Sequence, residues 1–400
     1  MAMPARPALE QHIRLDAIER AGRLAANRLV STRSGGIASA LAAHPVEQIP
    51  RLLTQLFPLC GMAHGVAGLT AIEQALDIEI SPAQAAFREL VVLAEHGAAL
   101  GWRISMDWPP FVGAPLDLRA CGDIRRAVAA VTGAARHSQW LQIGGAALRL
   151  DRTDLGRSVS ALAQMLTALF PEAADPAISF DALETALQTG ASVPARLIQT
   201  VRSRLPADYG CHDGPLLAAR PAEWFAACLA TDAGFSDAPT LDGRPAEVGP
   251  LAAQRHPLAA DAVARWGASL AARLLAAALD GPVIADRLRH IIDRLTDDDP
   301  PDACAMRAGR GAGVIETARG PLAYYVQVED GRVRILRNVA PTEWNFHPQG
   351  PFVAALEAAP RLADPAAAAR LLAASFDPCV PFDIALAPTR EAIAEDPLHA

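Results

Sequence analysis

The residues best suited to chemistry flank one stretch near the C-terminal end, residues 313–345. Arg319 supplies a fixed cation on one side, and Thr342, directly after Pro341, supplies a hydroxyl and backbone amides on the other. A guanidinium, a hydroxyl and nearby amides suit a small, electron-rich anionic acceptor better than a bulky organic substrate. The alternative is that these groups only end an exposed hairpin, with Arg319 in a surface ion pair.

A β-hairpin is the element that must bring these groups together. Apolar residues alternate with other residues over 324–328 and again over 333–335. Asp330-Gly331 between them supplies the two positive φ angles that a tight type I′ turn needs. Antiparallel pairing of the two strands would therefore bring the Arg319 and Thr342 ends close together.

Cysteine is the second residue type with chemical potential. Six cysteines are scattered without a disulfide framework or a Cys-x-x-Cys pair, so we expect reduced thiols. A free cysteine is by default a small buried hydrophobe. His64, four residues after Cys60, could share a metal with it on a helix or could be an ordinary, partly buried histidine. Cys211-His212-Asp213 has ligand chemistry but no partner at metal spacing. The cysteines are Cys60, Cys121, Cys211, Cys228, Cys304 and Cys379.

Most of the chain has helical periodicity, which predicts a mainly α (α+β) protein with one small β-hairpin region near residues 313–342. Residues 1–300 are expected to form a helical body, and residues 301–400 a hairpin plus a C-terminal segment packed into the same domain. Glu95 and His96 on an apolar helix are interpreted as a satisfied structural pair. Helices are expected over residues 7–29, 46–59, 65–76, 82–102, 152–170, 178–189, 258–279, 282–295, 351–358 and 364–374.

Composition narrows the functional classes. The 400 residues are 51% hydrophobic and 20% charged, which is enough for a large packed core. A net charge of −8 offers no field that would attract nucleic acid or an anionic membrane. No apolar run approaches the length of a membrane span, and the first residues lack a signal-peptide core. We therefore expect a cytoplasmic protein without nucleic-acid or membrane partners.

Four short segments give the chain a resemblance to the large subunit of nickel–iron hydrogenases. Leu59-Cys60-Gly61 resembles the N-terminal metal motif of that family, and residues 247–252, EVGPLA, resemble its central block. Residues 316–320 with 341–345 resemble the paired segments that cover the cyanide ligands of the iron. Residues 375–379, SFDPC, resemble the start of the C-terminal metal motif. The resemblance implies the large-subunit fold.

The departures from that family are informative. Each metal motif in the catalytic family has a second cysteine three residues after the first, and here those positions are Ala63 and Phe382. Without the two bridging thiolates a binuclear centre cannot close, so hydrogen turnover is not expected. The histidine of the C-terminal motif is replaced by Ala385. We therefore expect a C-terminal tail that is not cleaved.

The chain resembles the HupK-type hydrogenase formation proteins, which are regarded as assembly scaffolds. This resemblance implies a non-catalytic carrier that transiently holds iron with its cyanide and carbon monoxide ligands. Its partners would be hydrogenase maturation proteins, including the small delivery chaperone, and the hydrogenase large-subunit precursor. Two alternatives remain: a structural or vestigial homologue without metal, and a divergent redox enzyme. The implied metal ligands are Cys60 and Cys379, with Arg319, Thr342 and the backbone at Pro341 around the diatomic ligands. His64 is a third candidate metal ligand because of its spacing from Cys60, although the histidine of the family's motif corresponds to Ala67.

Overall fold

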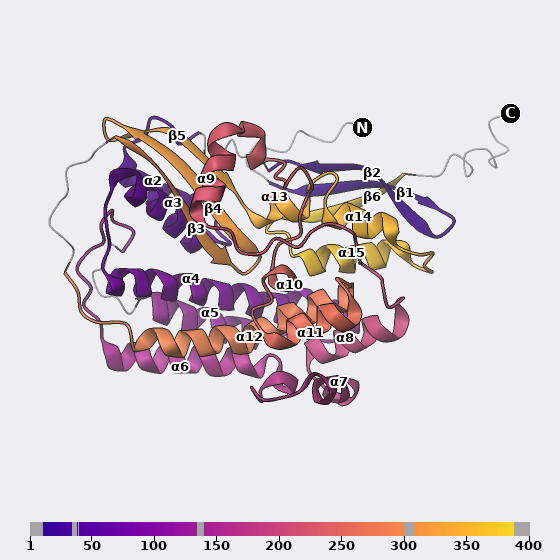
Figure 1. Cartoon of the computed structure of the whole chain (residues 1–400). Coiled ribbons are helices and arrows are strands. Elements are labelled where there is room, and N and C mark those ends of the chain that lie inside the picture. The colour runs from indigo at the N-terminus through magenta and orange to yellow at the C-terminus, as the bar shows by residue number, and fades with distance from the viewer. Residues whose placement is uncertain (1–10, 34–37, 39, 134–139, 300–307, 388–400) are drawn as a thin grey trace, which may run out of the picture.

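The computed structural model describes residues 11–33, 38, 40–133, 140–299 and 308–387. Helices dominate these residues, and two small sheets complete the fold (Figure 1). No helix among the residues described is long and apolar enough to cross a membrane. The helices are α2 (Ile49–Leu56), α3 (Gly61–Leu76), α4 (Pro82–Trp102), α5 (Leu118–Gly133), α6 (Arg152–Ala168), α7 (Phe180–Thr189), α8 (Val193–Arg204), α9 (Ala222–Thr231), α10 (Pro250–Ala253), α11 (Pro257–Trp266), α12 (Leu270–Ile292), α13 (Pro341–Asn345), α14 (Pro351–Ala358) and α15 (Pro365–Phe376).

The long helices α4, α5, α6 and α12 pack as a four-helix bundle, in which α4 and α6 each contact both α5 and α12 (Figure 1). Ser81 accepts a hydrogen bond from the backbone of Gln84 and Pro82 follows it, so α4 begins where the sequence predicts. The predicted boundary between α11 and α12 is wrong. Gly267, with φ of +64°, ends α11, and Pro282 lies inside α12. Helix α5 also forms within a region that the sequence leaves without a helix.

The predicted hairpin is confirmed, and it is part of a three-stranded antiparallel sheet, β3 (Gly309–Thr317), β4 (Gly320–Glu329) and β5 (Arg332–Val339). Asp330 and Gly331 have φ of +51° and +66°, as the tight turn requires. Strand β3 was not predicted, because small residues replace the alternating apolar residues that mark a strand.

The small residues of β3 allow helix α3 to pack closely against the strand. Gly309, Gly311 and Gly313 share one face of the strand, and a Cβ on any of them would lie 1.9–2.2 Å from a backbone oxygen of α3. Because side chains alternate across a strand, these three glycines expose a bare backbone stripe on which α3 lies. This contact fixes the position of α3 and of Cys60, which caps its N-terminus.

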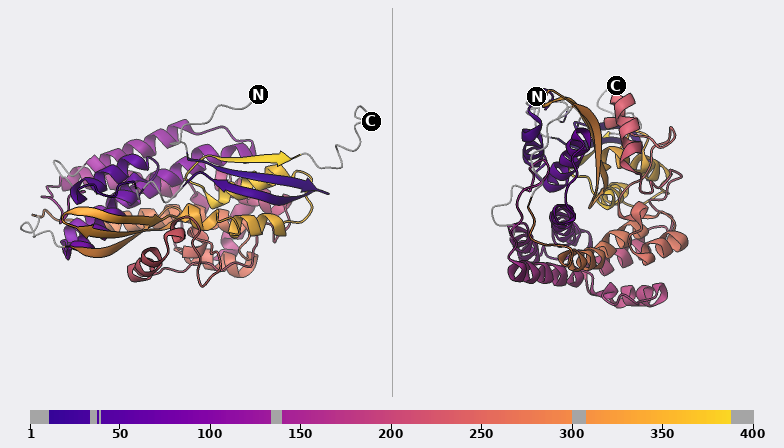
Figure 2. Two further views of the ribbon diagram at one scale, coloured as in Figure 1. Left: turned by 90° about the horizontal axis from the view of Figure 1, so that it is seen from above. Right: turned by 60° about the vertical axis from the view of Figure 1, so that its left-hand side comes forward.

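The two ends of the described chain form the second sheet, in the order β2-β1-β6. A helix predicted over residues 7–29 is wrong where the structure describes it. The segment instead forms β1 (Ile13–Arg20) and β2 (Arg23–Ser31), with Ala21 and Gly22 both at positive φ in the turn. Strand β6 (Phe382–Ala387) pairs parallel to β1, so the early and late strands lie side by side (Figure 2). The predicted uncleaved tail, residues 388–400, lies outside the described residues, as does Cys304.

Candidate functional site

Two cysteines from opposite ends of the chain meet in one small cavity. Cys60 is the N-cap of α3, and Cys379 lies between α15 and β6. Both side chains line this cavity, and each thiol shifts the pKa of the other. The residues that line the cavity come from α3 and its N-cap, the end of β3, the β3–β4 turn, β4, the start of α13 and the loop between α15 and β6: Cys60, His64, Thr317, Arg319, Leu322, Ala340, Pro341, Thr342 and Cys379.

Cys379 is the better hydrogen-bonded of the two sulfurs. Arg33 donates to its Sγ from Nη1 at 2.6 Å, and the Thr342 hydroxyl lies 3.2 Å from it. The pKa of Cys379 is well below its ordinary value, because the Cys60 thiol hydrogen bonds to it and because Arg33 and Arg319 place positive charge beside it. The pKa of Cys60 is raised by the same hydrogen bond and by burial. These shifts favour the thiolate form at Cys379 and the thiol form at Cys60.

Arg319 lies in the two-residue turn between β3 and β4. Its Nε is 2.9 Å from Oδ2 of Asp377 and donates to the Asp377 carbonyl at 3.0 Å. Asp377 also pairs with the buried Arg103. The side chain of Thr317 accepts from the backbone of Arg319 and donates to that of Gly320, which fixes the turn. Arg319 therefore lines the cavity while it is anchored beside Cys379 by a carboxylate.

Thr342 and Pro341 open the short helix α13. Thr342 is buried, and its hydroxyl faces the Cys379 sulfur. Pro341 contributes to the cavity wall, but it lacks an N–H and its backbone cannot donate a hydrogen bond. The hydroxyl and the guanidinium are thus the donor groups that these predicted residues offer.

His64 lies one helical turn after Cys60 and lines the same cavity. Its Nδ1 is 2.6 Å from the hydroxyl of Tyr324, and its ring stacks on Phe57 at a centroid distance of 3.6 Å. Burial and the charge of Arg33 lower its pKa well below the ordinary value, so the imidazole is neutral. No group of three or more His, Cys, Asp or Glu among the described residues could hold a metal ion. Ligation by His64 stays a prediction.

The four sequence segments converge through specific contacts. Asn345 in α13 donates to the Val248 carbonyl at 3.1 Å and accepts from its N–H at 3.0 Å. Gly249, at φ of +114°, packs backbone to backbone against the Arg319-Gly320 turn, and a Cβ at Gly320 would lie 2.9 Å from the Gly249 nitrogen. The central block thus supports the turn that carries Arg319.

Other candidate ligands have structural partners. Glu95 and His96 are both satisfied by structural partners, as the sequence predicts, and each has partners of its own. Glu95 accepts from the amides of Met62 and Ala63 at 2.8 and 3.0 Å, at the start of α3. His96 lies 3.2 Å from Asp280.

In the Cys211-His212-Asp213 stretch, Nε2 of His212 donates to the buried Glu247 carboxylate at 2.6 Å, and Nδ1 accepts from the Gly214 amide. Glu247 also forms a bidentate ion pair with Arg273. The imidazole therefore has both ring nitrogens engaged and belongs to a structural network.

Sequence reasoning missed Arg33 and Glu343. Arg33 follows β2, and its Nε donates to Glu343 of α13 at 2.6 Å while Nη1 reaches Cys379. No local pattern marks Arg33, and Glu343 was noted only within the 341–345 segment, because their contact depends on how the β2-β1-β6 sheet is assembled.

The positions of the absent second cysteines are filled by apolar side chains. Ala63 is buried in α3, and Phe382 opens β6, where its ring packs against Phe346 and Phe352. The described chain offers two thiols at this point of the fold and no bridging pair.

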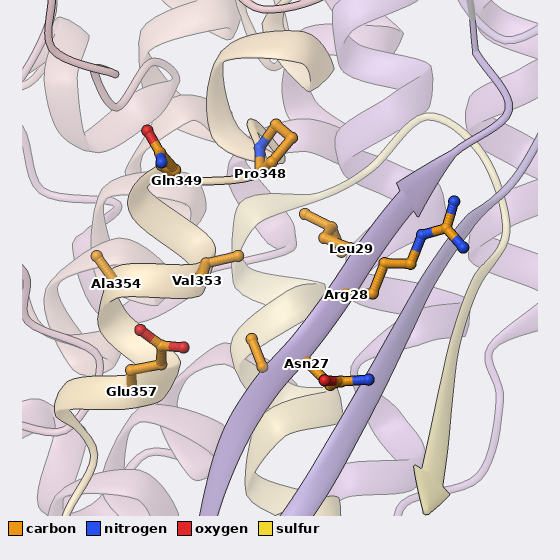
Figure 3. Close-up of a pocket in the computed structure, with 9 residues that line it drawn as sticks. Asn27, Arg28, Leu29, Pro348, Gln349, Val353, Ala354 and Glu357 are labelled. Carbon is orange, nitrogen blue, oxygen red and sulfur yellow. The ribbon is translucent and has the colours of Figure 1, made fainter.

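A larger cavity of about 300 Å³ lies apart from the cysteines, between β2 and α14 (Figure 3). Leu29 of β2 and Val353 of α14 extend toward it, and Glu357 lies at its margin. It shares no lining residue with the cysteine cavity. The packing of β2 against α14 around it helps to fix the end of β2 that leads to Arg33.

Comparison with known proteins agrees with this geometry. Residues 229–383 match the family described as nickel-dependent hydrogenase. The hydrogenase expression/formation protein HupK of Rhizobium leguminosarum bv. viciae is 30% identical over 88% of this chain and 90% of its own length. HupK of Bradyrhizobium diazoefficiens is 32% identical over 86% of this chain and 88% of its own length. The chain belongs to the HupK family of hydrogenase expression/formation proteins.

The fold of this HupK-family chain is that of a hydrogenase large subunit, as the sequence predicts. The Ni-Fe-Se hydrogenase from Desulfovibrio vulgaris Hildenborough superposes on it with a TM-score of 0.64 and 15% identity. The match covers 90% of this chain and 94% of that one. Family and fold thus agree, while Ala63 and Phe382 distinguish the chain from the two-cysteine metal motifs.

Proposed function

We propose that this protein is a non-catalytic hydrogenase maturation scaffold. It holds iron carrying cyanide and carbon monoxide between Cys60 and Cys379, and it passes this cargo to the precursor of the hydrogenase large subunit. The observation that carries the proposal is the meeting of the two thiols, from opposite ends of the chain, in one cavity beside Arg319 and Thr342.

The donor set suits this cargo. Thiolate sulfur is a soft ligand of the kind that low-spin iron with diatomic ligands accepts. Arg319 and the Thr342 hydroxyl can donate to cyanide nitrogens, and Leu322 and Ala340 keep part of the wall apolar. Exclusion of water and donation to the diatomic ligands are the two functions that the chain's own residues would serve.

The cavity also favours a carrier over a resident metal site. It measures about 10 Å³, room for about one water molecule, so cargo binding has to open its lining. Because only two protein sulfurs would bind the iron, few bonds have to break when it is released. The absence of thiols at Ala63 and Phe382 removes the bridges that a nickel–iron centre needs.

Infrared spectroscopy tests the proposal directly. The protein is purified without oxygen from cells that express the maturation machinery, as parent, Cys60→Ala and Cys379→Ala. We expect cyanide and carbonyl stretching bands in the parent and their loss in both variants. Cys228→Ala, at a half-buried cysteine of α9 outside the cavity, is the matched control and should keep the bands. A parent that lacks bands while iron and maturation partners are abundant would leave the metal-free structural role as the better account.

A further inference from the structure

We propose that Arg33 is a positioning residue that holds Cys379 as the anchoring ligand of the cargo and sets the electron density on its sulfur. The inference rests on the proposed function. It concerns a residue that lies outside all four sequence motifs and is supplied by the opposite end of the chain.

Sheet register explains how Arg33 reaches the site. Ile13, at the start of β1, pairs with Ser31 at the end of β2 and with Phe382 at the start of β6. Arg33 lies two residues beyond Ser31, and Cys379 lies three residues before Phe382. The three-stranded sheet therefore delivers both residues to the same end, where their side chains meet. The packing of β2 against α14 holds this end in place.

Two short hydrogen bonds fix the side chain of Arg33 between Cys379 and Glu343. Its guanidinium donates to the Cys379 sulfur and, from Nε, to the Glu343 carboxylate, both at 2.6 Å. The side chains of Arg33 and Glu343 are only 6% and 12% exposed. Glu343 is itself fixed, because it accepts from the Ala340 amide in the capping box of α13. A planar guanidinium with two of its edges occupied has little freedom, so the sulfur is held in one direction.

This arrangement has an electronic consequence that a purely structural residue would not have. A charge-assisted hydrogen bond withdraws electron density from a ligating thiolate. Iron bound to that sulfur then donates less density into the antibonding orbitals of carbon monoxide, and the carbonyl band stays at higher wavenumber. Removal of the donor should therefore move the carbonyl band to lower wavenumber.

The experiment compares infrared spectra of the anaerobically purified parent, Arg33→Gln and Arg33→Lys. We expect the carbonyl band to shift to lower wavenumber and the bands to decay faster in Arg33→Gln. Arg33→Lys, which keeps a positive donor, should restore part of both effects. Arg14→Gln, the same change at an exposed arginine of β1, should leave the spectrum unchanged. The double variant Arg33→Gln/Glu343→Gln avoids an unpaired buried carboxylate if the single variant fails to fold.

The outcomes separate the two proposals. Parent bands that persist at the same wavenumber and with the same lifetime in folded Arg33→Gln would overturn the role of Arg33 and leave the scaffold intact. A parent without bands would overturn the scaffold itself.

Discussion

Replacement of Asn345 by alanine should destabilise the protein more than any surface change. Asn345 is 2% exposed, and its side chain makes two hydrogen bonds with the backbone of Val248, which is 3% exposed. Asn345→Ala leaves a buried N–H and a buried carbonyl without partners, at about 1–3 kcal/mol each. We therefore expect a loss of about 2–6 kcal/mol in the free energy of unfolding. The Arg319 turn should loosen with it, because Gly249 supports that turn.

Urea denaturation followed by circular dichroism measures this loss as a shift in the transition midpoint. Asn27→Ala, at an exposed asparagine of β2, is the control and should stay within about 0.5 kcal/mol of the parent. Asn345→Asp should be intermediate, because a carboxylate can accept from the Val248 amide but cannot donate to its carbonyl. If Asn345→Ala unfolds within about 1 kcal/mol of the parent, the idea that this side chain joins the central block to α13 is refuted.

Two further predictions concern α3. Gly311→Ala should lower the free energy of unfolding by about 1–3 kcal/mol or more, because its Cβ would lie 2.2 Å from the Ala71 oxygen. In the control Gly156→Ala in α6, the new Cβ meets no neighbouring atom, so this variant should be slightly stabilised. Equal shifts of the melting temperature in the two variants would contradict this prediction. Burial raises the pKa of Glu95 to about 7 from 4.5, so the folded protein binds the extra proton between these pH values. This contribution to stability is complete below pH 4.5 and falls by about 3 kcal/mol as the pH rises through 7. The free energy of unfolding of Glu95→Gln should therefore depend less on pH than that of the parent. An unchanged pH dependence would assign the effect to other groups.

Local signals explain which parts of the fold were predictable. Ser81 and Pro82 mark the start of α4, and Asp330-Gly331 marks the β4–β5 turn, because capping and positive φ depend on a few adjacent residues. Strand β3 was missed because its glycines serve contact with α3 and carry no apolar alternation. The N-terminal strands were missed because their apolar residues also fit a helical pattern, and only pairing with β6 separates the two.

The sequence by itself determined the family, the helical character, the hairpin turn, and the loss of the two bridging cysteines at Ala63 and Phe382. Only the tertiary structure decided that Cys60 and Cys379 line one cavity and that Arg33 and Glu343 complete their surroundings. The physical reason is the separation along the chain between the residues that interact. A turn or a cap is set by neighbours in the chain, whereas this site forms where the register of β2, β1 and β6 brings the first and last described strands to the end of α3.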